Sequence, residues 1–347
     1  MLKSFLATLT PMLSMFLFIL IGFLLKKKNI LTDGSAKTMA RLVTWVFYPA
    51  LSFATMARNF TINTITTHVQ NLTIGLVSLT IAIGIAVPLS HLFVRKKEYE
   101  RGVYQYALAF ANSGYVGDPL VLALFGEAIL SHYKIITLPI SIAIYTWGIS
   151  RLVPTKSADR KETLKKLLNA PLVALFFGML VGILSGLIVK DVPLGTTAYD
   201  ELFPTFLTST VDTLKSCMGP MAMLLAGVTV AKYNIFEMFN KKKVYIATAL
   251  RLIIIPSVII TLLFGLKTLA NIIFGLDIDN TAILLIFFAI ATPLGLNTVV
   301  FPEAYGMDAK TGASMALISH TLCVITIPLM FMLASYVLGD NSMLIFK

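Results

Sequence analysis

The sequence NSGYVGDPLVLALFG, residues 112–126, lies in a stretch that is otherwise apolar enough to cross a membrane as a helix. It carries three glycines, a proline and the carboxylate of Asp118. Proline removes a helical hydrogen bond and clashes with the preceding turn, and glycine lets the chain leave helical geometry. In hydrocarbon, unpaired backbone persists only where protein or a water-filled cavity satisfies it. We therefore predict an interrupted membrane helix at 114–119.

A second interruption is predicted at ATPLGLN, residues 291–297, where Pro293 and Gly295 stand among apolar residues. Interrupted membrane helices meet near the bilayer midplane and present half-helix N-termini, which carry partial positive charge and bind anions. We expect the interruptions at 114–119 and 293–297 to form one polar, electropositive pocket. The alternative is two ordinary proline kinks with no binding role.

The composition of the whole chain is that of a membrane protein. It is 57% hydrophobic and 13% charged, with a mean hydropathy of +0.85, whereas soluble domains are about 25% charged. A bilayer core needs about 20 apolar residues per helix. We predict an all-α polytopic membrane protein with ten transmembrane helices, at 5–25, 38–57, 71–94, 103–126, 132–152, 170–189, 206–230, 244–265, 281–302 and 312–337.

Basic residues fall mostly on one side of this predicted topology. With the N-terminus outside the cell, the cytoplasmic connections hold 20 of the 28 Lys and Arg residues, and the other side holds seven, among them Arg58 and Lys134. Positive residues favour the cytoplasm. We therefore expect a multi-pass protein of the cell membrane with both termini extracytoplasmic. Basic loops facing anionic lipid account for the net charge of +11, so no nucleic-acid partner is expected.

A long basic stretch divides the ten predicted helices into two groups of five. We predict a first repeat over 1–153, a cytoplasmic linker over 154–169 and a second repeat over 170–347. An odd number of helices in each half inverts the second half relative to the first, as in transporters with inverted repeats. Helices 4 and 9, which carry the two interruptions, would then occupy corresponding positions and cross.

Motifs for catalysis and metal binding are missing from the sequence. No HExxH, CxxC or GxxxxGK[ST] pattern occurs, so neither zinc nor nucleotide hydrolysis is predicted, and no cofactor is expected beyond a coupling H⁺ or Na⁺. An intramembrane enzyme would need a partner for Asp118, and the nearest acid near the second interruption is Glu303, ten residues past Pro293. The chain is therefore not expected to be an enzyme.

The motifs at Asn112–Pro119 and Ala291–Gly295, with the sequence around Pro49 and Phe301–Gly306, resemble the auxin efflux carrier family over essentially the whole chain. This family includes plant auxin carriers and bacterial malonate and malate permeases. The resemblance implies the bile-acid/sodium symporter fold, with a scaffold of helices 1, 2, 6 and 7, a mobile domain of helices 3–5 and 8–10, elevator-type alternating access and a homodimer through the scaffold. It also implies that Asn112 lies beside the substrate carboxylate and that Pro119 and Pro293 are the crossover prolines.

The sequence departs from the plant carriers at several positions, including Pro302-Glu303-Ala304 after the second interruption. Asp118 replaces an apolar residue, and Asn297 and Thr298 stand where the plant proteins have valine and proline. An ionisable residue at membrane depth is a functional candidate, so we expect Asp118 to bind the coupling proton or sodium ion. The alternative is that Asp118 caps the second half-helix. His320 is a second candidate for coupling, with a packing role as its alternative.

We predict a secondary transporter for a small organic anion, a mono- or dicarboxylate such as malate, malonate or an auxin-like acid. The alternatives are a monovalent cation/proton antiporter or sodium-coupled symporter of related fold, and a channel. The predicted substrate-binding residues are Asn112, Ser113, Gly114, Gly117, Pro119, Thr292, Pro293, Gly295 and Asn297.

Overall fold

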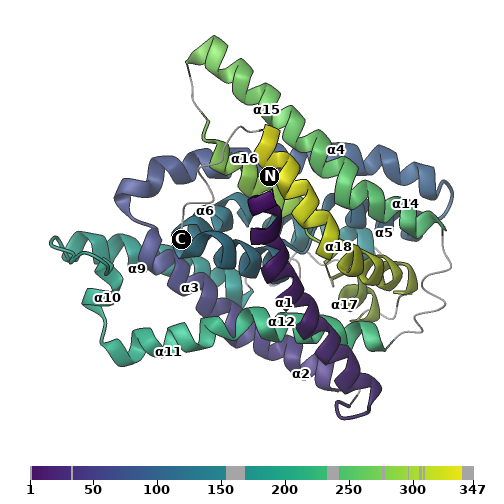
Figure 1. Ribbon diagram of the computed structural model, residues 1–347, viewed down its shortest axis with the longest axis horizontal. Helices are drawn as coiled ribbons and strands as arrows, with labels where there is room; N and C mark the ends of the chain where they lie inside the picture. The colour runs from purple at the N-terminus through teal and green to yellow at the C-terminus, as the bar shows by residue number, and fades with distance from the viewer. Residues whose placement is uncertain are drawn as a thin grey trace.

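The computed structural model describes residues 2–32, 34–153, 169–232, 242–275, 278–295, 297–304, 307 and 309–337, so nearly all of the predicted linker at 154–169 lies outside the described residues. Regular structure within these ranges is helical, with no sheet (Figure 1). In hydrocarbon a helix satisfies its backbone groups within one segment, which explains why such an apolar sequence folds this way. The prediction of an all-α polytopic protein is confirmed.

The described helices follow one another with few long connections. In chain order they are α1 (Leu2–Lys27), α2 (Ser35–Leu42), α3 (Tyr48–Asn59), α4 (Ile65–Phe93), α5 (Glu98–Ala109), α6 (Asp118–Ala143), α7 (Ile149–Leu152), α9 (Ala170–Ile188), α10 (Ala198–Leu202), α11 (Thr205–Ser216), α12 (Met218–Ala231), α14 (Lys242–Ala249), α15 (Ile255–Phe274), α16 (Asn280–Ala291), α17 (Asn297–Ala304) and α18 (Lys310–Val337). Short π-helical turns η1 (Val43–Phe47), η3 (Ser113–Gly117), η4 (Ile144–Gly148) and η6 (Leu250–Ile254) join some of them, and the 3₁₀ turn η2 (Ile62–Thr64) precedes α4.

Seven helical stretches among the described residues are long and apolar enough to cross a membrane. They are Thr8–Lys27, Ile62–Phe93, Ser113–Leu152, Ala170–Ile188, Thr205–Ala231, Lys242–Ile273 and Lys310–Tyr336. Helix length and apolarity alone do not identify ten membrane crossings in the structure. The stretch Ser113–Leu152 contains a turn, and α16 has only 12 residues. Residues 282–291 of α16 are all buried, so this short helix lies in the protein core and away from lipid.

Helix α6 folds back on itself at Gly126. This glycine has φ 81° and ψ −176°, a backbone conformation open almost only to glycine. Asp118 and Lys134 are 16 residues apart, which is about 24 Å along a straight helix, yet their side chains are in direct contact. The outgoing arm (118–125) and the returning arm (127–143) of α6 are therefore two antiparallel helices. The sequence interpretation separated these helices but did not identify Gly126 as the turn.

Both predicted interruptions exist, and they contact each other. The chain is non-helical at 110–112 and at 292–295, between α16 and α17. Ala111 forms an isolated antiparallel β-bridge with Leu294, and the Asn112 N–H donates to the Pro293 carbonyl at 2.8 Å. The prediction that the first interruption occupies 114–119 is wrong. Pro119 stands in the first turn of α6, where a missing N–H costs little, and Gly114 and Gly117 belong to the π-helical turn before it.

Two helix pairs pack with their backbones close together. A side chain at Gly178 or Gly182 of α9 would collide with backbone atoms of α3. In the same way, a side chain at Gly22 of α1 or Gly227 of α12 would collide with the backbone of the partner helix. Small residues allow this close approach, which maximises van der Waals contact in a membrane where the hydrophobic effect does not join helices.

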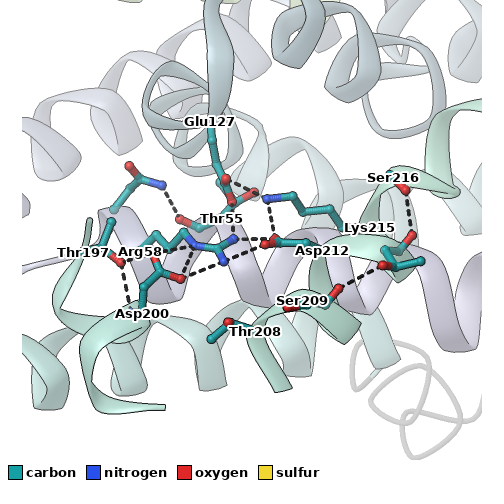
Figure 2. Close-up of polar contacts among 12 residues, drawn as sticks. Thr55, Arg58, Glu127, Thr197, Asp200, Thr208, Ser209, Asp212, Lys215 and Ser216 are labelled. Atoms are coloured by element: carbon teal, nitrogen blue, oxygen red, sulfur yellow. Dashed lines mark hydrogen bonds and ion pairs between the residues drawn. The ribbon is translucent and has the colours of Figure 1, made fainter. Parts of the chain in front are cut away.

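An ion-pair network joins α3, α6, α10 and α11 (Figure 2). Arg58 donates to Asp200 at 2.9–3.1 Å and to Asp212 at 2.7 and 3.0 Å, and Lys215 donates to Glu127 at 2.7 Å and pairs with Asp212 at 2.9 Å. Burial acts to raise the pKa of Asp200, but hydrogen bonds from Arg58 and Thr197 outweigh it and lower the pKa. Glu127 directly follows the Gly126 turn, so the network holds the tip of the α6 hairpin.

Candidate functional site

A cavity of about 100 Å³ lies where the two interruptions meet. The first interruption and η3 contribute Ala111, Asn112, Ser113, Gly114 and Tyr115, and the second contributes Gly295 and Asn297. The remaining wall comes from η1 and α3, from the returning arm of α6 with η4, and from the start of α9. Their polar side chains in the wall are Thr44, Tyr48, Ser52, Lys134, Thr137, Ser141, Tyr145 and Asn169.

Hydrogen bonds to Pro293 and Tyr115 hold Asn112 in position. Its backbone N–H pairs with Pro293 across the bridge, and its side-chain oxygen accepts from the Tyr115 N–H at 3.3 Å, which caps η3. The side-chain amide nitrogen has no hydrogen-bond partner among the described residues, and Asn112 is only 7% exposed. A buried N–H without a partner costs free energy comparable to a lost hydrogen bond. Asn112 therefore presents a free donor at the cavity.

Lys134 carries the charge of the cavity. Among the described residues that line it, Lys134 alone is formally charged. Its ammonium donates to Asp118 at 2.5 Å and to the Ser52 hydroxyl at 3.2 Å, and it lies 4.3 Å from the centroid of the Tyr48 ring. Lys134 and Asp118 are 3% and 1% exposed. Sequence reasoning assigned Lys134 to an extracytoplasmic connection, and that prediction is wrong: the lysine is buried because the α6 hairpin returns it to Asp118.

Asp118 does not cap a helix. No side-chain cap bond is formed at the start of α6, and the capping side chain of this half-helix is that of Asn112, at the start of η3. The Asp118 carboxylate pairs with Lys134 and does not line the cavity itself. The lysine therefore stands between the carboxylate and the cavity.

Gly117 and Pro119 belong to the wall behind the site, since neither lines the cavity. A side chain at Gly117 would collide with the Tyr133 hydroxyl, whose single proton is shared between the carbonyls of Ser113 at 3.1 Å and Phe288 at 3.4 Å. Those bonds tie the first half-helix to α16. Gly117 thus supports the site by making room for Tyr133.

Residues of the second interruption divide between two places. Gly295 and Asn297 line the main cavity, and the Asn297 amide donates to the Tyr106 hydroxyl at 3.2 Å. Pro293 lines a separate small cavity of about 10 Å³. Thr292 lines neither cavity, and its buried hydroxyl has no hydrogen-bond partner in the part of the chain that the structure describes.

His320 also lies away from the main cavity. It lines the small cavity together with Pro293, and its Nδ1 hydrogen-bonds the Ala316 carbonyl at 2.7 Å. On the same helix, Ser319 accepts from the Leu294 N–H at 3.0 Å and so holds the second interruption. The structure therefore separates His320 from the pair formed by Asp118 and Lys134.

Comparison with known proteins identifies the family of this chain. The sequence profile of a family described as membrane transport protein matches residues 7–163 and 153–331. An uncharacterized transporter of Methanocaldococcus jannaschii is 25% identical over 317 residues, which cover 90% of this chain and 94% of the relative. The family is the one that the two interrupted motifs resemble, the auxin efflux carrier-like group. The chain therefore belongs to the membrane transport protein family and is a transporter.

Proposed function

We propose that this protein is a secondary active transporter of a small organic anion and that the cavity between the two interruptions is its substrate site. The observation that carries the proposal is the pairing of two buried donors on one cavity, the unpartnered amide of Asn112 and the ammonium of Lys134. Carboxylates accept several hydrogen bonds and bind ammonium groups through charge-assisted ones. A cation would meet a positive charge here.

The remaining lining favours a small acid with a polar or aromatic body. Hydroxyls of Thr44, Ser52 and Thr137 and the rings of Tyr48 and Tyr145 form much of the wall. Sites of this kind bind the body of a ligand through apolar and aromatic surface and fix its orientation with a few polar groups. Monocarboxylates and small dicarboxylates, such as malate, malonate and auxin-like acids, are the proposed substrate class.

The proposed architecture is ten transmembrane helices in an inverted 5+5 repeat, 1–153 and 170–347, with crossing interrupted helices. The bridge between the two interruptions and the fold-back at Gly126 support it. The close pairs α1–α12 and α3–α9 correspond to the proposed scaffold, and they are the backbone contacts expected of a rigid unit. The other helices would carry the site across the membrane as an elevator, and a homodimer would form through the scaffold.

Asp118 is the proposed site of the coupling ion, H⁺ or Na⁺, because it is a buried carboxylate joined to a cavity-lining residue. His320 would contribute only indirectly, through the second interruption. We place the protein in the cell membrane with both termini outside the cytoplasm.

Uptake of radiolabelled malonate, malate and indole-3-acetate into proteoliposomes tests this function. We expect saturable uptake of at least one acid, and competition by unlabelled acid. Sodium/proton exchange that is independent of every acid would favour the cation antiporter, and an unsaturable ion current would favour a channel. Either result would contradict the proposal.

A further inference from the structure

The buried charges around the cavity cancel when the site is empty. Lys134 and Asp118 form a pair in direct contact, and both are almost fully buried. The other titratable groups facing Asp118 are Tyr133 on the returning arm of α6 and Tyr48 on α3, and both are neutral acids. The packed helices α12 and α16 carry no titratable residue. The site therefore holds one positive and one negative charge.

The ammonium of Lys134 has room for a new partner. Asp118 and Ser52 accept two of its hydrogen bonds, and the face of the Tyr48 ring takes the place of a third polar partner. A ring face attracts a cation more weakly than a carboxylate does. A carboxylate entering the cavity, which Lys134 lines, can therefore replace the ring as a partner of the ammonium.

Binding of such an anion unbalances the charge. Two carboxylates would then share one ammonium in a site away from water, where an uncompensated charge is strongly disfavoured. Two like-charged carboxylates at one site hold a proton more readily than either does alone. A proton from the aqueous phase that adds to an Asp118 oxygen restores neutrality: the ammonium keeps its charge and balances the substrate.

We propose that Lys134 exchanges partners during transport, from Asp118 to the substrate carboxylate, and that Asp118 binds one proton for each anion bound. This inference rests on the proposed function and specifies its coupling ion. Sodium is disfavoured at Asp118 because the ammonium in contact with the carboxylate repels a second cation. The substrate charge follows as well: a singly charged carboxylate gives an electroneutral loaded site, whereas a doubly charged one leaves an excess negative charge.

Proton uptake during binding tests the exchange. Purified wild-type protein in weakly buffered solution with a pH-sensitive dye is titrated with acetate, malonate, malate and indole-3-acetate adjusted to the same pH. We expect about one proton taken up per anion bound, and an infrared difference spectrum with a new band of a protonated carboxylic acid. A wild-type protein that binds an acid with no proton uptake, or without this band, overturns the inference and leaves the proposed function intact. If no acid binds or is transported, the proposed function itself fails.

Variants assign the proton to one residue. Asp118→Asn is expected to bind the anion with no proton uptake. Its Kd should change with pH at least tenfold less than the wild-type Kd does. Lys134→Gln is expected to weaken binding by tenfold or more, and Lys190→Gln, which changes an exposed lysine, is its control. Full proton uptake by Asp118→Asn overturns the assignment. If that variant does not fold, Asp118→Glu is measured instead: a carboxylic-acid band shifted from its wild-type position assigns the proton to residue 118, and an unshifted band overturns the assignment.

Discussion

At Asn112 a single side chain serves both the fold and the site. Its oxygen caps η3 through the Tyr115 N–H, and its nitrogen is free at the cavity. An N-cap acceptor is worth about 1 kcal/mol, so the residue would be useful even without a ligand. The unpartnered nitrogen supports the proposal that Asn112 binds the substrate, because a cap needs only the oxygen.

Two substitutions at Asn112 separate these roles. Asn112→Asp keeps an oxygen for the Tyr115 N–H but removes the donor and places a negative charge at the cavity. We expect it to retain more thermal stability than Asn112→Ala and to lose at least tenfold in affinity for the transported acid. Melting temperature and ligand titration measure the two effects. Wild-type affinity in Asn112→Asp would show that the amide does not contact the substrate.

Gly117 provides a test of packing behind the site. In Gly117→Ala the new methyl group would collide with the Tyr133 hydroxyl, and overpacking of this kind costs about 1–3 kcal/mol. We expect a lower melting temperature that Tyr133→Phe partly restores in the double variant. Gly84→Ala is the matched control, since a Cβ there meets no atom within 4 Å. Equal melting temperatures for the two alanine variants would contradict the close contact.

Residue chemistry could be predicted from the sequence where the signal is local, and not where it depends on a distant partner. Asp118 was identified because an ionisable residue is conspicuous inside an apolar helix, and Asn112 was identified through the family motif that it begins. Lys134 was missed because it stands near the start of a predicted helix, where a lysine ordinarily faces water. Its burial follows from the turn at Gly126, which brings it to Asp118. There Lys134 is the cationic partner that a buried carboxylate requires.

Among the elements, α6 depends on a single residue for its shape. Gly126 has open space around the position of a Cβ, so a substitution there would be penalised by its backbone conformation rather than by a clash. We expect Gly126→Ala to lower stability by about 1–3 kcal/mol. Gly265→Ala on α15, with equally open space and no positive φ, is the control. A melting temperature for Gly126→Ala equal to that of the control would contradict the turn.

The Arg58 network makes a prediction about the hairpin tip. Arg58→Met leaves Asp200 and Asp212 without their guanidinium partner, and we expect a loss of about 1–3 kcal/mol, less than for a fully buried pair because water screens these groups. Arg58→Lys should recover only part of it, since an ammonium cannot form the bidentate contacts. Melting of detergent-solubilised protein measures both, and wild-type melting in Arg58→Met would contradict a stabilising network.

The lowered pKa of Asp200 fixes the sign of the pH effect. Its ion pair stabilises the fold above the unfolded pKa of about 3.9, and this contribution is lost as the pH falls below that value toward the lower folded pKa. Arg58→Met should therefore show a weaker loss of melting temperature below about pH 4 than the wild-type protein shows.

The sequence predicts that two helices are interrupted more reliably than it predicts at which residues they are interrupted. Glycine and proline correctly indicated that two helices are interrupted, and the second interruption was placed well. The first was placed too late in the chain. Residues 110–112 contain neither glycine nor proline, and they are extended because they pair with Leu294 and Pro293 from the other half of the chain. A partner nearly two hundred residues away leaves no local signal.

At the scale of the whole molecule, the two close helix pairs form a rigid part, and the cavity lies at its boundary with the other helices. The glycine contacts of α1 with α12 and of α3 with α9 allow little relative movement within each pair, because packed backbones are not continuously deformable. The cavity lies between these helices and the interruptions, since Tyr48 and Ser52 of α3 line it together with Asn112 and Gly295. In the proposed mechanism, movement of the other helices against these pairs opens and closes the site, and the substrate shifts that balance only by binding one state more tightly.

The most direct test of this account is an experimental structure of the protein bound to the acid that the uptake assay selects. The account predicts density for the acid in the cavity between the two interruptions, with its carboxylate within hydrogen-bonding distance of the Asn112 amide and the Lys134 ammonium. Density for the acid elsewhere in the protein, with both of these groups left without a ligand, would contradict it.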